Sequence, residues 1–258
     1  EFRRVLFRSW AIRELGASGE FGVLPLIGSK ELVAWLPTLL QSKTLLYPEI
    51  AYPTYLVGGL IAQIKVTAVG FDSATWPSAE LAWINSPSNP TGRISSDQEL
   101  NGAINWARNN GVVVSDECYL EFGSTSKPKS ILAFSGGDNR NLLALHSLSK
   151  RSSMAGYRAA MLIGDPELIA RILEVRKHAG MMVPLPVQQA MIAALSDNKH
   201  VEQQRALYNS RKTKVRSAIE PHGFRIEHSE AGLYLWATDR KSTRLNSSHE
   251  RISRMPSS

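Results

Sequence analysis

The chain has 258 residues, of which 43% are hydrophobic, 21% charged and 8% aromatic. This composition is typical of a globular protein with a sizeable core, and it excludes a disordered chain, a collagen and a disulfide-rich scaffold. The single cysteine, Cys118, allows no internal disulfide and favours a reducing compartment. Apolar stretches such as 32–40 are shorter than the roughly 18 residues of a membrane span, so we expect a soluble protein without a secretory signal.

The positive charge lies at the two ends of the chain. Of the net charge of +7, residues 1–9 contribute +2 and residues 239–258 contribute +3, which leaves +2 for residues 10–238. Both terminal strings lack the periodicity of a helix or a strand and resemble translated sequencing adapters, so we expect neither to belong to the fold. The overall charge suggests an alternative, a basic protein that binds nucleic acid, whose binding would disappear when both ends are removed.

Through the middle of the chain, short apolar or β-branched runs alternate with amphipathic helices. A helix is predicted over 31–40, directly after Gly28, Ser29 and Lys30. A second helix, over 96–109, begins with a serine cap and ends at an Asn-Gly pair. Strands are predicted at 44–47, 65–68, 81–85, 112–115, 142–146 and 160–163. This alternation predicts an α/β fold with a mainly parallel sheet and helices on both faces.

Beyond residue 172 the pattern becomes mainly helical. The predicted elements are helices at 187–195 and 201–219 and strands at 224–226 and 233–236. We therefore expect a large domain at 10–178, whose N-terminal part is missing, and part of a smaller α+β domain at 179–238.

Polar segments follow several of the predicted strands. They are NSPSNPTG at 85–92, SDECY at 115–119 and SLSK at 147–150. In an open α/β sheet, ligands bind at the carboxyl ends of the strands, so these segments are candidates for one site. The backbone N–H groups after Gly28 would favour an anion at the start of a helix. Taken singly, each segment also fits a simpler interpretation as a turn, a helix cap or a solvated lysine.

In this order and spacing, the segments resemble the class I and II aminotransferases of the pyridoxal-phosphate (PLP) fold-type I superfamily. The most specific parts are NPTG at 89–92, DExY at 116–119 and SxSK at 147–150, with Arg158 eight residues after the lysine. The resemblance extends over nearly all of 10–238. Segments such as HSLSKRSSMAGYR at 146–158 make the resemblance strongest to actinobacterial-type N-succinyldiaminopimelate aminotransferases, although no single residue identifies the substrate.

The resemblance implies a role for each matching residue. Lys150 would hold PLP as a Schiff base and transfer the proton at the substrate α-carbon. Asp116 would pair with the pyridinium nitrogen, and the simpler interpretation of this residue is a turn cap. Asn89 and Tyr119 would hydrogen-bond the phenolic oxygen of the ring. Tyr52 would stack on the ring, unless it is a half-buried core aromatic.

The phosphate of PLP would be held by the remaining matching residues. These are Ser29, Lys30, Ser147 and Arg158. Arginine suits this role because its guanidinium makes two parallel hydrogen bonds to an anion. His146 is expected to pack or to hydrogen-bond locally, and no His/Cys cluster has the spacing of a metal site, so we expect no metal.

The expected activity is the transfer of an amino group from a donor, glutamate, to N-succinyl-2-amino-6-oxopimelate by a ping-pong cycle in lysine biosynthesis. The resemblance also implies a cytoplasmic homodimer acting on small molecules, without nucleic acid or membrane. Three alternatives stay open besides the nucleic-acid-binding protein: an aminotransferase of other specificity, a PLP-dependent β-lyase and an inactive truncated fragment.

Two parts of the family pattern have no counterpart in the sequence. The arginine that binds the substrate α-carboxylate in the family would follow the last predicted strand, where the adapter-like string begins. Arg240 and Arg244 lie there, but neither has a matching context. The N-terminal arm of the family has no counterpart before Trp10.

Overall fold

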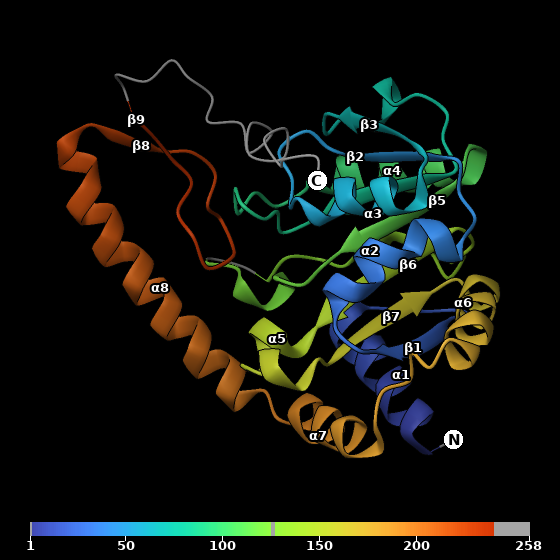
Figure 1. Ribbon diagram of the computed structural model, residues 1–258. Helices are drawn as coiled ribbons and strands as arrows, with labels where there is room; N and C mark the ends of the chain where they lie inside the picture. The colour runs from blue at the N-terminus through green and yellow to red at the C-terminus, as the bar shows by residue number, and fades with distance from the viewer. Residues whose placement is uncertain (1, 125–126, 240–258) are drawn as a thin grey trace, which may run out of the picture.

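The computed structural model describes residues 2–124 and 127–239 (Figure 1). Its strands are β1 (Gly22–Leu26), β2 (Thr44–Pro48), β3 (Lys65–Val69), β4 (Leu81–Asn85), β5 (Val112–Asp116), β6 (Leu142–Ser147), β7 (Ala160–Gly164), β8 (Phe224–Ile226) and β9 (Ala237–Asp239). Its helices are α1 (Phe2–Leu15), α2 (Ser29–Leu39), α3 (Thr54–Ala62), α4 (Asp97–Asn109), α5 (Leu148–Arg151), α6 (Pro166–His178), α7 (Leu185–Ser196) and α8 (Lys199–Ile219).

Seven strands form the central sheet in the order β1-β7-β6-β5-β4-β2-β3. The pairings from β6 to β3 are all parallel, whereas β7 runs antiparallel to both of its neighbours, β1 and β6. The prediction of a mainly parallel α/β sheet is therefore confirmed. Each strand predicted between residues 44 and 163 is present, as is the helix over 96–109, where Ser96 and Glu99 form a reciprocal capping box.

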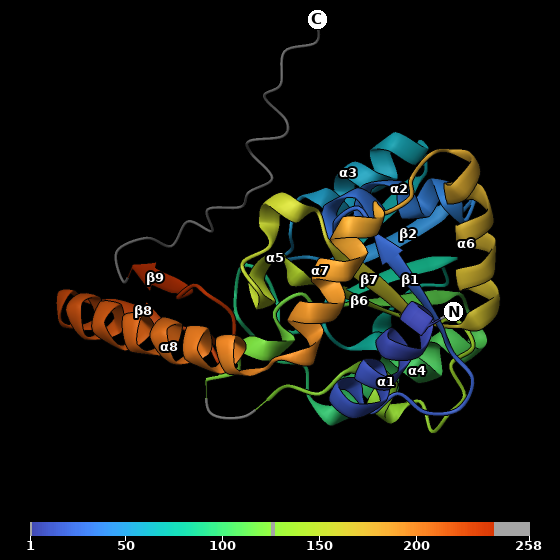
Figure 2. The same ribbon diagram turned by 90° about the horizontal axis from the view of Figure 1, so that it is seen from below.

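Helices cover both faces of the sheet, and the alternation of side chains along each strand separates two apolar cores. On β6, Leu142 and Ala144 point to one core, while Leu143 and Leu145 point to the other. The first core includes side chains of α1, α4 and α7, and the second includes those of α2, α3 and α6. Figure 2 shows α1 and α4 below the sheet and α2 and α3 above it. Burial on both faces explains the continuous apolar runs of the central strands.

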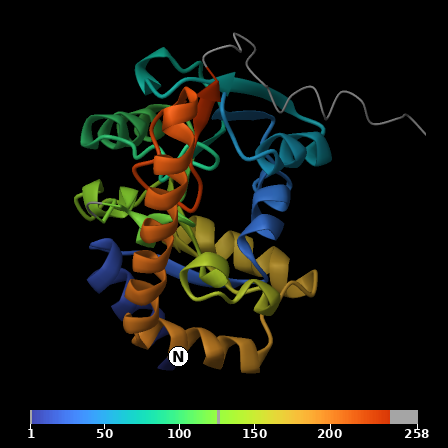
Figure 3. The same cartoon turned by 90° about the vertical axis from the view of Figure 1, so that its left-hand side faces the viewer.

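The C-terminal part of the described chain extends away from the sheet. Helix α8 follows α7 and runs across the side that faces the viewer in Figure 3. Beyond it, β8 and β9 pair antiparallel as a separate two-stranded sheet. The predicted helices and the strand at 224–226 are confirmed here. Among the helices of the described ranges, none combines the length and the apolar character that a membrane crossing requires.

Three expectations differ from the structure. Residues 2–9 belong to α1, where Phe7 is 1% exposed, so tertiary packing forms a helix that periodicity did not predict. The strand at 233–236 is wrong: the hydroxyl of Ser229 accepts the Trp236 N–H at 2.8 Å, and pairing with β8 begins at residue 237. Strand β1 was not predicted, because Pro25 weakens the strand signal, although an edge strand tolerates proline. Residues 240–258 lie outside the described residues.

A buried ion pair ties the start of α2 to the end of α6. The Arg176 side chain is 0% exposed, and its Nη1 lies 2.6 Å from Glu31 Oε1. Its Nη2 donates to the carbonyl of Met181 at 3.2 Å. Helix α2 begins at Ser29, close to Glu31. The ion pair and the bond to Met181 therefore hold the first turn of α2 against the end of α6 and the segment that follows α6.

We expect Glu31→Leu to lower the free energy of unfolding by about 3 kcal/mol, because it leaves the Arg176 charge buried without a counter-charge. Urea denaturation followed by tryptophan fluorescence measures this loss. The double variant Glu31→Leu/Arg176→Met should recover most of it. Glu174→Leu, which breaks an exposed pair with Lys177, serves as the control and should have little effect. If Glu31→Leu and the control Glu174→Leu lowered the free energy of unfolding equally, the prediction would be contradicted.

Candidate active site

The carboxyl ends of β4, β5 and β6 lie side by side at one edge of the sheet. Asn85 and Asp116 are register partners at the ends of β4 and β5, and Ser147 ends β6. Strand β1 runs in the same direction as β6, so the turn at Gly28 reaches this edge as well. The topology therefore brings together segments that are far apart in the sequence.

A pocket of about 280 Å³ lies at this edge. Every side chain that the family resemblance implies for the cofactor lines it: Ser29, Lys30, Tyr52, Asn89, Asp116, Tyr119, Ser147, Lys150 and Arg158. The pocket also includes residues for which sequence analysis predicted no individual role: Asn85, Cys118, Ser149, Ala155 and Tyr234. The predicted residues thus share one site, while their individual roles stay predictions.

Asn85 fastens two of the loops that form the pocket. Its side-chain amide donates to the carbonyl oxygens of Asp116 at 2.9 Å and Pro87 at 3.1 Å. Its carbonyl oxygen accepts the Asn89 N–H at 2.7 Å. The position of Asn85 as the last residue of a predicted strand was the one sequence signal for this role.

Asp116 presents a buried carboxylate to the pocket. The residue is 6% exposed. Its Oδ2 accepts a hydrogen bond from the Tyr55 hydroxyl at 2.8 Å, and its Oδ1 accepts the Cys118 N–H at 3.1 Å. Burial raises the pKa of Asp116, and these hydrogen bonds oppose that rise. A cationic partner in the pocket would therefore stabilise the ionised carboxylate.

Tyr119 and Tyr234 come from distant parts of the chain, and their side chains interact in the pocket. Burial raises the pKa of Tyr119, so its phenol stays protonated at neutral pH and can donate. Tyr234 is 50% exposed and faces the same pocket.

The segment that carries Tyr234 is docked on two loops of the large domain by backbone hydrogen bonds. Ser229 N donates to the carbonyl of Thr91 at 3.0 Å, and Ala231 N donates to that of Gly92 at 2.9 Å. Gly232 N donates to the carbonyl of Phe122 at 3.0 Å. These contacts fix the position from which Tyr234 reaches the pocket.

A cationic cradle surrounds the start of α2. Gly28 has φ +94°, and a Cβ at this position would overlap the Arg158 guanidinium. The absence of a side chain on Gly28 therefore lets Arg158 lie against the N-terminus of the helix, where backbone N–H groups also favour an anion. The Lys30 ammonium lies 5.6 Å from the centroid of the Tyr52 ring. This arrangement is suited to a multiply charged anion such as a phosphate.

Lys150 lies in the short helix α5, which Ser147 caps by accepting the Ser149 N–H at 3.1 Å. The next residue, Arg151, is buried and anchors the helix: its Nη1 donates to the carbonyl of Ala194 at 2.8 Å and its Nη2 to Asn198 Oδ1 at 2.6 Å. The Lys150 segment is thereby attached to the junction between α7 and α8.

His146 does not line the pocket. Its Nε2 lies 2.7 Å from Glu117 Oε2, and both side chains are buried. Glu117 Oε1 also accepts the Ile131 N–H at 2.8 Å. The expectation that His146 makes a local hydrogen bond is confirmed.

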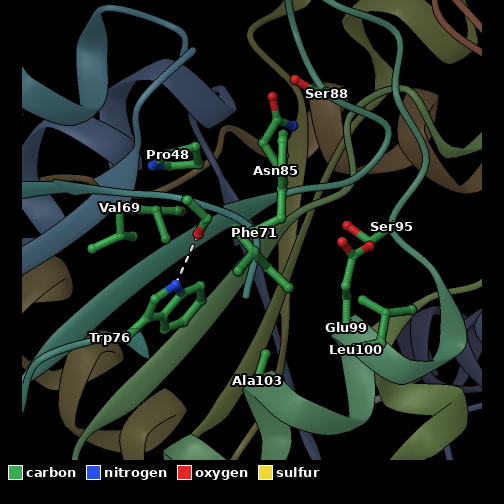
Figure 4. A pocket seen from close by; sticks show the side chains of 13 residues that line it. Pro48, Val69, Phe71, Trp76, Asn85, Ser88, Ser95, Glu99, Leu100 and Ala103 are labelled. Atoms are coloured by element: carbon green, nitrogen blue, oxygen red, sulfur yellow. Dashed lines mark hydrogen bonds between the residues drawn. The ribbon is translucent and has the colours of Figure 1, made fainter. Parts of the chain in front are cut away.

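A second hollow, shown in Figure 4, shares Asn85 with this pocket. Aromatic side chains including Phe71, Trp76 and Trp83 line it, and Trp76 Nε1 donates to the carbonyl of Gly70 at 2.8 Å. Its volume of about 30 Å³ has room for one or two water molecules and no substrate. The pocket that contains Asp116, Lys150 and Arg158 is therefore the candidate active site.

Comparison with known proteins identifies the family. Residues 18–249 match the model of the class I and II aminotransferases. The chain is 50% identical over 240 residues to a 4-dedimethylamino-4-oxo-anhydrotetracycline transaminase of Streptomyces rimosus, covering 89% of this chain and 66% of the relative. It is 51% identical over 226 residues to a probable aminotransferase of Mycobacterium tuberculosis, covering 85% of this chain and 54% of the relative.

A solved structure agrees with these relatives. A probable N-succinyldiaminopimelate aminotransferase from Thermus thermophilus superposes with a TM-score of 0.84 at 25% identity, covering 91% of this chain and 68% of that one. The chain belongs to the class I and II aminotransferase family, whose cofactor is PLP. It spans between about half and two thirds of the length of the two sequence relatives.

The side chains of the pocket fit PLP. The cradle around Gly28 offers Ser29, Lys30 and Arg158 to a phosphate. The buried carboxylate of Asp116 suits a protonated ring nitrogen, and Lys150 supplies an amine within the same cavity. The arginine expected to bind the substrate carboxylate is not identified, and Arg240 and Arg244 lie outside the described residues.

We expect Gly28→Ala to weaken PLP binding by roughly tenfold, about 1.4 kcal/mol, because alanine is strained at positive φ and its methyl group displaces Arg158. The measurement is the Kd of PLP from an absorption titration. Gly156→Ala is the matched control, because nothing lies within 4 Å of a Cβ there. Unchanged affinity in Gly28→Ala would show that the cradle does not hold the phosphate.

Proposed function

We propose that the chain forms the catalytic pocket of a PLP-dependent aminotransferase. The observation that supports this most is the single pocket in which Lys150, Asp116 and the candidate phosphate ligands lie together. Family membership supports it independently.

Each side chain has a distinct task in this proposal. When bound, PLP supplies an electron sink for the electron pair released at the substrate α-carbon. Lys150 Nζ holds the cofactor and moves the proton at that carbon. The Asp116 carboxylate keeps a proton on the ring nitrogen, and Asn89 and Tyr119 bind the phenolic oxygen. Tyr52 would pack against the ring.

The phosphate group is bound by the cradle. Its ligands are Ser29, Lys30, Ser147 and Arg158, which combine two positive charges with two hydroxyl groups and the N-terminus of α2.

For the substrates, we propose glutamate as donor and N-succinyl-2-amino-6-oxopimelate as acceptor, handled in turn in a ping-pong cycle. The likeness to the Thermus structure, whose name gives that activity, supports this acceptor. The resemblance further leads us to propose a homodimer in the cytoplasm.

An aminotransferase of different specificity is the second candidate. The identity of 50% to a transaminase named for an oxo-anhydrotetracycline supports it. A screen of oxo acids with glutamate as donor separates the two candidates. Preference for a ring-containing oxo acid over the succinylated dicarboxylate would favour the second candidate, and elimination without amino transfer would favour a β-lyase.

We expect PLP added to the chain to give a visible absorption band, and borohydride reduction to attach it to Lys150, as peptide mapping by mass spectrometry would show. Lys150→Ala should lose the band and all amino transfer, because the proposed covalent attachment and proton transfer both need the Lys150 amine, while the variant still binds PLP non-covalently. Attachment at a different lysine, or full activity of the variant, would remove Lys150 from its proposed role.

Asp116→Ala should lower the rate of amino transfer by several orders of magnitude, because an unprotonated ring withdraws electrons poorly. Single-turnover kinetics with glutamate measure this rate. Glu49→Ala, a change outside the pocket lining, serves as the control. A loss of tenfold or less in Asp116→Ala would contradict the proposed role.

A further inference from the structure

Tyr55 is a buried tyrosine that the family resemblance leaves without a role. It lies in the first turn of α3, is 0% exposed, and its hydroxyl donates to Asp116 Oδ2 at 2.8 Å. It is not among the residues that line the cavity, and its hydroxyl reaches the pocket through the Asp116 carboxylate.

We propose that Tyr55 is a positioning residue, which orients the Asp116 carboxylate and lowers its affinity for a proton, so that the proton shared with the ring nitrogen of PLP stays on that nitrogen. This inference rests on the proposed function, because it assumes that Asp116 faces the ring nitrogen.

The packing around Tyr55 leaves its hydroxyl little freedom. Its ring stacks on Trp83, with centroids 5.1 Å apart and planes inclined by 28°. It also meets the Tyr52 ring edge-on at 6.0 Å. A tyrosine held between two aromatic side chains has few alternative rotamers, so the donor stays aimed at Asp116.

In the hydrogen bond between Tyr55 and Asp116, the Tyr55 hydroxyl is the donor and the carboxylate is the acceptor. Burial and the nearby Asp116 charge raise the pKa of Tyr55 well above its ordinary value, so the phenol remains protonated and donates. A carboxylate that accepts a hydrogen bond holds its own proton less tightly. Tyr55 and the Cys118 N–H together oppose the effect of burial, which raises the pKa of Asp116.

The balance matters because two bases compete for one proton. If Asp116 became the stronger base, the proton would move from the ring nitrogen to the carboxylate, and the ring would withdraw electrons less well. A donor on Oδ2 weakens Asp116 as a base without removing its negative charge. A phenylalanine at position 55 would keep the packing and lose this effect.

Other polar groups also face Asp116 and stay in place when Tyr55 is changed. The Cys118 thiol, His146 and Tyr119 interact with its charge, and the pocket contains a cationic set: Lys30, Lys150 and Arg158. A change in the titration of Asp116 in Tyr55→Phe therefore reports the lost hydroxyl.

The test is a ¹³C NMR titration of the Asp116 carboxyl carbon in the chain without PLP, assigned with Asp116→Asn. We expect Tyr55→Phe to raise the pKa of Asp116 by about one unit, a tenfold gain in proton affinity. Tyr47→Phe is the matched control, because Tyr47 is a buried tyrosine of the same apolar core, and it should leave the titration unchanged. No shift in a folded Tyr55→Phe variant would overturn the proposal.

A second measurement covers the case in which Tyr55→Phe does not fold. Placing 3-fluorotyrosine at position 55 makes the phenol a stronger donor of nearly the same size, so the pKa of Asp116 should fall below its wild-type value. A rise or no change would overturn the proposal.

The outcome for Tyr55 is separable from that of the proposed function. If the wild-type chain does not bind PLP, the proposed function fails, and Tyr55 loses its role towards the cofactor even if the titration shifts. If PLP attaches to Lys150 but Asp116 titrates alike with and without the Tyr55 hydroxyl, the proposed function stands and the Tyr55 inference fails.

Discussion

The parallel register of β4, β5 and β6, fastened at its carboxyl edge by Asn85, is the constraint on which the site depends. The Asn85 side chain bonds the backbone of Asp116 on the neighbouring strand and of Asn89 in its own loop. Asn85 and Asp116 are register partners, and β6 continues past Leu145, the partner of Asp116, to Ser147, so an amide, a carboxylate and a hydroxyl gather at this edge. Apolar cores on both faces of the sheet hold this register, because a shift of one residue would exchange the two cores.

Burial gives the polar groups at this edge their chemical character. Asp116 and Tyr119 sit where water is largely excluded, so burial favours the neutral form of each, and hydrogen bonds decide how far. The basic side chains around Gly28 supply the opposite charge within the same cavity. A ligand with both an anionic phosphate and a cationic ring nitrogen satisfies both parts of the pocket, whereas a simple anion would satisfy one.

The sequence predicted the central strands and the site segments well, because apolar runs and polar loop motifs are local signals. It did not predict β1, whose identity depends on pairing with β7 across more than a hundred residues of chain. Helix α1 depends likewise on burial of Phe7 and Trp10 in the core. Asn85 and Tyr55 act through contacts with Asp116, and a pattern read along the chain does not show which buried tyrosine reaches which carboxylate.

The lining of the pocket comes from two separate parts of the chain. The candidate cofactor ligands come from loops at the sheet edge, but Tyr234 comes from a segment that docks on Thr91, Gly92 and Phe122 after α8. Tyr234 is half-exposed and lines the same pocket as Tyr119, so the docked segment closes one side of the cavity that the loops at the sheet edge form.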